Sequence, residues 1–89
     1  MMIFLFGSGG VSVYDNQMIA ERIKSRAKER HVKLKDMLNF LSMGINLISQ
    51  LAKGSNITAI NLAQIADYLD CSVDYLLGRT ENPQSHKEN

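Results

Sequence analysis

From Asn16 onward, apolar residues recur at the spacing of an amphipathic helix. Ile19, Ile23 and Ala27 stand four residues apart, Ala20 lies beside the first of them, and charged residues fill the intervening positions. This spacing places the apolar side chains on one face and predicts a first helix of about three turns.

The next apolar stripe predicts a second helix that ends at a short break. Its members stand at i, i+3, i+4 and i+7: Leu34, Met37, Leu38 and Leu41. That is the spacing of a helix face that packs on a core. Residues 42–44 interrupt the pattern, and Gly44 is an acceptable N-cap for a third helix over residues 45–53.

The same stripe returns in the second half of the chain. Its members are Leu62, Ile65, Ala66 and Leu69, and they predict a fourth helix capped by Thr58 and ending near Asp70. Ser72 is expected to cap a last short helix, with Asp74 in its first turn and Gly78 as its stop. Val73, Leu76 and Leu77 of that helix are expected to face inward.

The pattern as a whole predicts an all-α fold, a compact domain of five short helices over residues 15–79. With 89 residues, the chain has room for one core. Residues 80–89 are polar and are expected to form a flexible tail.

Residues 1–14, MMIFLFGSGGVSVY, form an apolar and glycine-rich extension with two open interpretations. Apolar runs on both sides of a Gly-rich turn favour a β-hairpin, which would need the domain or a second chain to pack on. Alternatively, a Gly-Gly pair can be encoded by GGAGGN, which resembles a bacterial ribosome-binding site, and translation would then begin near Val13 at a GUG start codon.

Charge is distributed unevenly, although the net charge is only +1. Residues 1–53 hold eight basic and four acidic residues, whereas residues 54–89 hold two and five. Seven of the ten basic residues fall within residues 22–35. This basic run is either a surface that holds a polyanion or a solvated helix face.

The residues that usually carry catalysis or bind metals are sparse. Cys71 is the only cysteine, and neither it nor His31 or His86 stands at a spacing typical of metal ligands or a nucleophile. We therefore expect a buried apolar Cys71 in a cytoplasmic protein with no cofactor, no metal and no evident small-molecule substrate. The apolar run of residues 1–6 is too short to span a membrane.

The third predicted helix has an unusual polar face. Ile48 and Leu51 would face the core, which leaves Asn46, Ser49, Gln50 and Lys53 on the opposite side. Asn and Gln can bond bidentately to adenine in the major groove of DNA, Ser can bond several bases, and an apolar side chain such as Ile45 can touch the thymine methyl. A solvated face is the simpler interpretation.

Three segments together resemble the lambda-repressor-like (Cro and Xre-type) helix-turn-helix family. They are ISQLAKG at residues 48–54, LAQIADYL at residues 62–69 and SVDYLLGRT at residues 72–80. The resemblance covers residues 17–79 and implies a five-helix domain that places its third helix in the major groove, usually as a symmetric dimer on double-stranded operator DNA.

The resemblance also implies particular contacts. Base contacts fall on Ile45, Asn46, Ser49 and Gln50. Phosphate contacts of the following loop fall on Lys53, Gly54, Ser55 and Asn56. The Ser-Gln pair that usually opens the second helix of the family is Lys33-Leu34 here, so the phosphate contact of that glutamine would fall to Lys33 or Lys35. Two further departures are Ser42 in place of the turn glycine and Ala52 in place of a glutamate.

These features predict a transcriptional regulator, a repressor of phage or mobile-element type that binds a palindromic operator as a homodimer. The dimer is expected on DNA even if the free chain is monomeric. Candidate contacts between free chains are the last helix with the tail, or strand pairing of residues 1–6. The alternative is an Xre-type antitoxin or another protein-interaction module, which would use the N-terminal segment or the acidic end.

Overall fold

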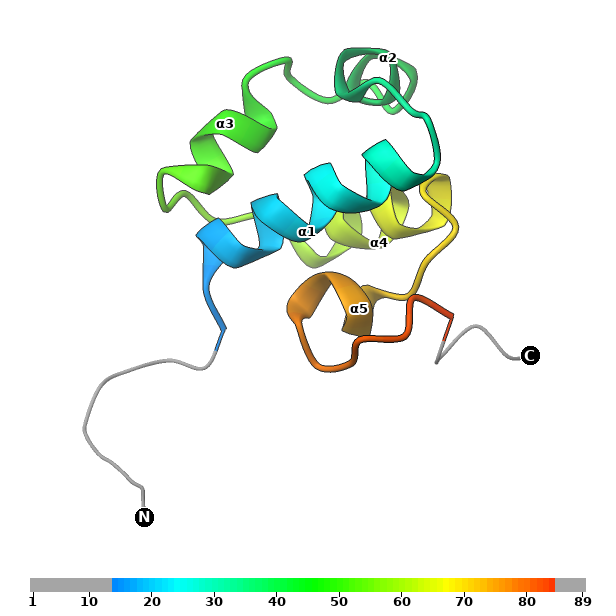
Figure 1. Cartoon of the computed structure of the whole chain (residues 1–89). Coiled ribbons are helices and arrows are strands. Elements are labelled where there is room, and N and C mark those ends of the chain that lie inside the picture. Colours follow the sequence, from blue (N-terminus) through cyan, green and yellow to red (C-terminus); the bar gives the residue numbers. More distant parts are fainter. Residues whose placement is uncertain (1–13, 85–89) are drawn as a thin grey trace.

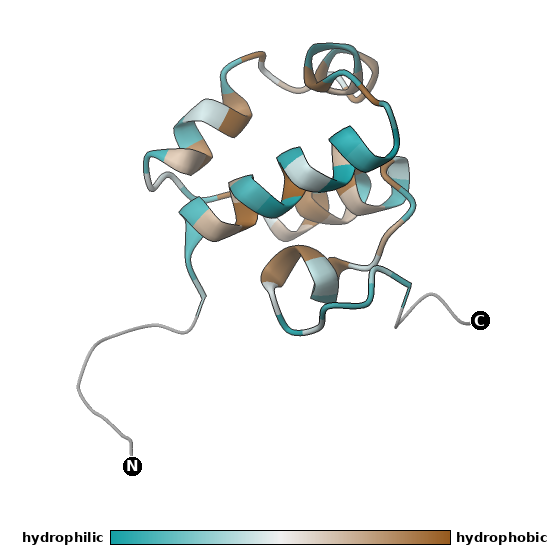
Figure 2. Cartoon of the chain, in the orientation of Figure 1, coloured by the Kyte–Doolittle hydropathy of each residue, from teal (hydrophilic) through white to brown (hydrophobic). Residues whose placement is uncertain are grey.

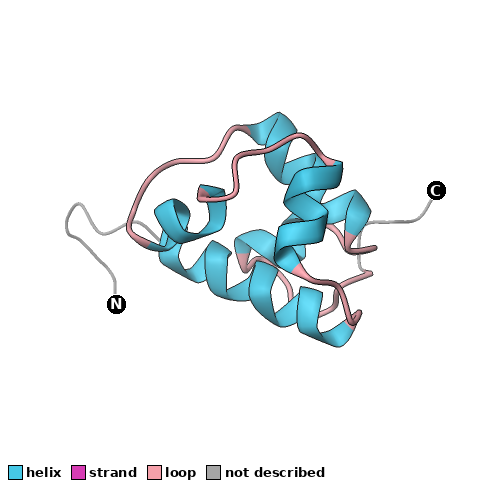
Figure 3. Cartoon of the chain, turned by 90° about the horizontal axis from the view of Figure 1, so that it is seen from above, coloured by secondary structure: helices cyan, strands magenta, loops and turns pink. Residues whose placement is uncertain are grey.

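The computed structural model describes residues 14–84, and every regular element in that range is a helix (Figures 1 and 3). The five helices are α1 (Asn16–Glu29), α2 (Leu34–Phe40), α3 (Leu47–Ala52), α4 (Ala59–Tyr68) and α5 (Val73–Leu77). The prediction of an all-α fold with five helices is therefore confirmed.

One core lies between the helices, with α1 at its centre. α1 lies against α3 and α5, and α4 also contacts α5 (Figure 1). Hydrophilic and hydrophobic residues alternate along α1 with the helical period (Figure 2). The buried apolar residues are Ile19, Ala20, Ile23, Ala27, Met37, Leu38, Ile48, Leu51, Leu62, Ile65, Ala66, Leu69, Cys71, Tyr75 and Leu76. The predicted stripes and the buried Cys71 are confirmed, except that Leu34, Leu41, Val73 and Leu77 are only partly buried.

Three helices begin at a side chain that caps them. Asp15 accepts a hydrogen bond from the backbone N–H of Gln17 in α1. As predicted, Thr58 caps α4 and Ser72 caps α5, each accepting from the backbone N–H three residues later. Such caps satisfy N–H groups that have no partner within the helix.

All five helices end in the same way, at a residue with positive φ. These residues are His31, Ser42, Gly54, Asp70 and Gly78. In each case the next residue's N–H bonds to a carbonyl five residues back, as in Val32 to Ala27 and Met43 to Leu38. This is the Schellman arrangement, which satisfies the last carbonyls and turns the chain sharply. Three of the five positions lack glycine, so those turns are strained.

Replacing Ser42 with glycine is expected to raise the free energy of unfolding by about 0.5–1 kcal/mol. Ser42 has φ +59°, a conformation that glycine adopts without the steric cost of a Cβ atom. The greater freedom of glycine in the unfolded chain offsets part of this gain. Urea denaturation measures the difference. The control is Ser25→Gly within α1, which should lower stability by about 0.5 kcal/mol.

The third helix is shorter than predicted. It begins at Leu47, not at residue 45, and Asn46, not Gly44, is its N-cap. The N–H of Leu47 bonds to the carbonyl of Gly44 at 3.1 Å, so residues 44–47 form a turn before the helix starts. The hydrophobic pattern did not reveal this later start, because a β-turn and the first turn of a helix space their side chains in a similar way.

The packed part of the chain extends further than predicted at its C-terminal end. The N–H of Ser72 donates to the carbonyl of Pro83 at 2.7 Å, and the Gln84 side chain donates to the carbonyl of Asp70 at 2.8 Å. Residues 80–84 therefore lie against the domain. Residues 1–13 and 85–89 lie outside the described residues, as do the predicted hairpin and the possible start at Val13.

Residues 14–84 contain neither a membrane-spanning helix nor a cluster of metal ligands. None of the helices there has the length and apolar character needed to cross a bilayer. The same residues contain no cluster of three or more His, Cys, Asp or Glu side chains that could hold a metal ion.

Candidate nucleic-acid interface

The polar side chains predicted to read bases lie together on the outer side of α3. Asn46, Ser49, Gln50 and Lys53 are all exposed, whereas Ile48 and Leu51 on the opposite side are buried. The late start of α3 does not disperse them, because Asn46 still stands one turn before Gln50 and accepts its backbone N–H at 2.9 Å. The result is one polar face at the edge of the domain.

Two details define what this face offers a ligand. The Asn46 side chain makes no cap hydrogen bond to α3. The Ser49 hydroxyl donates to the Asn46 carbonyl at 3.0 Å, so its oxygen faces solvent as an acceptor. Ile45 lies just before this face and is 63% exposed. Amide, hydroxyl and apolar groups are thus presented side by side.

The loop after α3 is held by a residue that the sequence did not single out. The side-chain amide of Asn16, at the start of α1, donates to the Gly54 carbonyl at 3.1 Å and to the Asn56 side chain at 2.9 Å. Gly54 has φ +107°, which suits glycine, and residues 53–56 are all exposed. Asn16 therefore anchors the loop to α1, while the N–H groups of Gly54 and Ser55 bond to the carbonyls of Leu51 and Gln50 at the end of α3.

Asn16→Ala is expected to lower the free energy of unfolding by about 1 kcal/mol, because it removes two hydrogen bonds from a partly exposed site. Amide hydrogen exchange at Ser55 and Asn56 should also become faster than in the wild type. Asn39→Ala, at an exposed position on α2, is the matched control. If exchange in the loop is the same in both variants, Asn16 does not hold it.

The lysines predicted to contact phosphate stand at two helix ends. Lys33 is the N-cap of α2, where it makes no side-chain cap, and Lys35 lies in the first turn of that helix. Lys53 follows the last residue of α3. A cation at a helix N-terminus is unfavourable by about 0.3–1 kcal/mol. Lys33 and Lys35 therefore do not stabilise α2, whereas an anion bound beside them would be attracted by both side chains and by the helix end.

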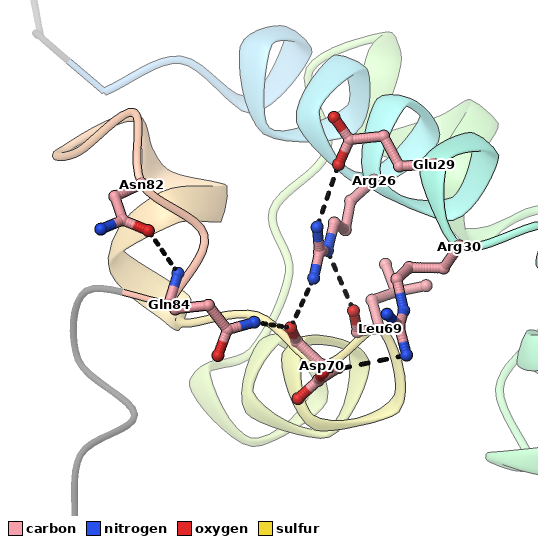
Figure 4. A network of polar contacts seen from close by, with 7 residues as sticks. All are labelled: Arg26, Glu29, Arg30, Leu69, Asp70, Asn82 and Gln84. Carbon is pink, nitrogen blue, oxygen red and sulfur yellow. Dashed lines mark hydrogen bonds and ion pairs between the residues drawn. The ribbon is translucent and has the colours of Figure 1, made fainter.

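The basic run does not form a single positive surface. Its three arginines stand one turn apart on α1 and its C-cap and contact the C-terminal half of the chain. Figure 4 shows the contacts of Arg26 and Arg30. Arg26 is only 9% exposed; its Nε donates to the Leu69 carbonyl at 3.0 Å and one Nη to the Asp70 carbonyl at 2.7 Å. Its other Nη pairs with Glu29 at 3.0 Å.

Arg22 and Arg30, one turn before and one turn after Arg26, also contact the C-terminal half of the chain. Arg22 pairs with Glu81 at 2.9 Å, and its guanidinium lies 4.8 Å from the centre of the Tyr75 ring. Arg30 is 3.8 Å from the Asp70 carboxylate. Part of the positive charge of residues 22–35 is therefore paired with acidic residues of the C-terminal half. The lysines of the run are exposed.

Sequence reasoning placed these arginines among solvent-exposed charges. Their spacing of four residues was a signal, since Arg22, Arg26 and Arg30 share one side of α1. The residues that Arg26 contacts carried no such signal, because Arg26 bonds to backbone carbonyls, which every residue has.

Comparisons of the chain with protein-family models, with characterised proteins and with solved structures found no match.

Proposed function

We propose that this protein is a non-enzymatic, sequence-specific DNA-binding transcriptional regulator of the lambda-repressor-like (Cro/Xre) type. In this proposal α2 and α3 act as a helix-turn-helix, and α3 enters the major groove of double-stranded DNA. The observation that carries the proposal is the exposed face of α3, where Asn46, Ser49 and Gln50 are presented with Ile45 beside them.

The chemistry of this face suits base reading better than simple solvation. An exposed helix face that serves only solubility is commonly rich in Lys and Glu, which form i,i+4 pairs. α3 instead offers two amides, a hydroxyl acceptor and an apolar side chain. Asn and Gln match adenine N6 and N7, and Ile45 suits a thymine methyl. We therefore assign Ile45, Asn46, Ser49 and Gln50 to base contacts.

Phosphate contacts are assigned to residues that flank this face. Lys33 and Lys35 begin α2, and Lys53 begins the loop that continues through Gly54, Ser55 and Asn56. Lysine, serine and asparagine side chains that flank a recognition helix can contact phosphates and fix the register of the helix on the duplex without reading sequence. The anchoring of the loop by Asn16 supports this role, because a fixed donor loses less conformational entropy on binding.

The proposed regulator is a repressor of phage or mobile-element type that acts in the cytoplasm as a homodimer. A single helix as short as α3 contacts only a few base pairs, so useful specificity requires two copies on a palindromic operator. The two half-sites would lie roughly 34–36 Å apart, or a multiple of that distance, so that both copies approach the same side of the duplex.

Selection of bound sites from random DNA tests the proposal. We expect enrichment of a palindrome whose half-sites keep this spacing, with two copies bound per duplex. Inserting half a helical turn, roughly five base pairs, between the half-sites should abolish the gain from the second copy. If one copy saturates an isolated half-site and the affinity is no higher for the palindrome, the proposed dimer is contradicted.

A protein-interaction role, such as that of an antitoxin, is the second candidate. It is favoured by Phe40, which is 74% exposed and contacts Tyr68 with ring centres 5.4 Å apart, and by Ile60, which is 69% exposed. A toxin gene adjoining this one, together with a selection that enriches no sequence, would favour this candidate over the regulator.

A further inference from the structure

An open apolar groove lies where the described chain begins. It has a volume of about 530 Å³ and is formed by the starts of α1 and α4, the loop before α4, and α5. Ile57, Val73 and Leu77 line it and are only partly buried, and Leu62 contributes to its floor. The volume falls within the range of about 300–1,000 Å³ that is typical of ligand sites. These side chains leave apolar surface that a further group can cover.

The edge of the groove holds a charge that already has partners. Arg79 donates to the Tyr14 hydroxyl at 2.8 Å and pairs with Asp74 at 3.3 Å. The pKa of Arg79 is raised above its ordinary value, chiefly by the hydrogen bond to Tyr14 and then by the nearby charges. Because Asp74 balances its charge, Arg79 gives little preference to an anionic ligand. The groove is best suited to a neutral apolar occupant.

We propose that residues 3–6 of the same chain dock in this groove. These residues are Ile3, Phe4, Leu5 and Phe6, and they carry no charged side chain. Tyr14 lines the groove, so the chain that precedes it starts at the site. Seven residues lie between Phe6 and Tyr14, so the chain makes eight steps from one to the other and can span up to about 26–29 Å. The Gly-Ser-Gly-Gly sequence of residues 7–10 lets the chain reverse its direction.

The length of this connection favours docking within one chain over docking between two. A short flexible connection gives an effective concentration in the millimolar range, which exceeds the concentration of a second copy under ordinary conditions. The proposal also favours the structural interpretation of the N-terminal extension, because a chain that began near Val13 would lack the occupant.

Methyl NMR spectra of the full chain test the proposal. In the variant Leu5→Asp, we expect the methyl signals of Ile57, Leu62, Val73 and Leu77 to shift, because a carboxylate at residue 5 disfavours burial. The matched control is Ser8→Asp, which places the same charge in the Gly-rich connection and should leave those signals unchanged. The methyl signals of Ile23 and Ile65 in the core report that each variant is folded.

The outcomes separate the possible occupants. Shifts of the groove signals in Leu5→Asp alone, the same at low and high protein concentration, support docking within the chain. Groove signals that are identical in the wild type and Leu5→Asp would overturn the proposal. Wild-type groove signals that change with protein concentration would assign the groove to a second copy and overturn it as well. DNA is absent from the experiment, so the result is independent of the proposed regulator.

Discussion

Replacing Arg26 with methionine is expected to lower the free energy of unfolding by about 3 kcal/mol. The methionine keeps most of the packing volume but removes the donors to the carbonyls of Leu69 and Asp70 and the pair with Glu29. In this variant the Asp70 carbonyl still accepts a hydrogen bond from the Gln84 side chain, whereas the Leu69 carbonyl loses the bond from the Arg26 guanidinium. A domain of this size is stable by only about 5–15 kcal/mol, so the loss is a large fraction. Urea denaturation followed by circular dichroism measures it.

Two further variants separate the role of Arg26 from a general effect of charge. Lys28→Met removes a positive charge from an exposed position on the same helix and should change stability by less than about 0.5 kcal/mol. Arg26→Lys keeps the charge but loses the fork that reaches two carbonyls, so it should fall between the wild type and Arg26→Met. Equal stability of Arg26→Met and Lys28→Met would show that the network in Figure 4 does not stabilise the fold.

The number of helices and most of the core were predictable because both depend on local spacing. Ile65 and Leu69 are buried for the reason that the sequence suggests, since residues three and four apart share one helix face. The caps Thr58 and Ser72 were predictable for a similar reason, because a capping side chain and its N–H partner lie within one turn.

Contacts between distant residues were not predictable. Arg26 meets Leu69 and Asp70 across more than forty positions of the chain, and a periodic pattern contains no information about partners so far apart. The same holds for Asn16, whose partners Gly54 and Asn56 lie 38 and 40 positions further along the chain.

The ends of the helices were partly predictable. Gly54 and Gly78 mark their turns by residue type, because glycine tolerates positive φ. His31 and Asp70 adopt the same conformation without that signal. His and Asp are enriched at positive φ among non-glycine residues, but they occur far more often in other conformations, so the residue type alone did not mark these turns.

For the candidate interface, the sequence correctly predicted which side of α3 is exposed, but not where the helix begins. Asn46, Ser49, Gln50 and Lys53 face away from Ile48 as predicted. The assignment of these side chains to bases or phosphates stays a prediction, since their exposure does not by itself distinguish base reading from solvation.

Asn46→Ala and Gln50→Ala are each expected to weaken binding to the preferred operator by about 1–3 kcal/mol and to leave binding to random duplexes almost unchanged. The loss lies in discrimination, because an amide that bonds adenine N6 and N7 has no equivalent partner on other base pairs. Preference should relax at particular positions of the operator. The matched control is Gln64→Ala, which removes an exposed amide from α4.

Lys35→Ala and Lys53→Ala are expected to behave in the opposite way. Each should weaken binding to every sequence alike and reduce the slope of log affinity against log salt by about one unit, since each phosphate contact releases condensed counterions. One salt titration on operator and random duplexes separates the two groups of variants. If Asn46→Ala and Gln50→Ala fold normally and keep full operator preference, the polar face of α3 is a solvated surface, and the proposed regulator loses its means of reading sequence.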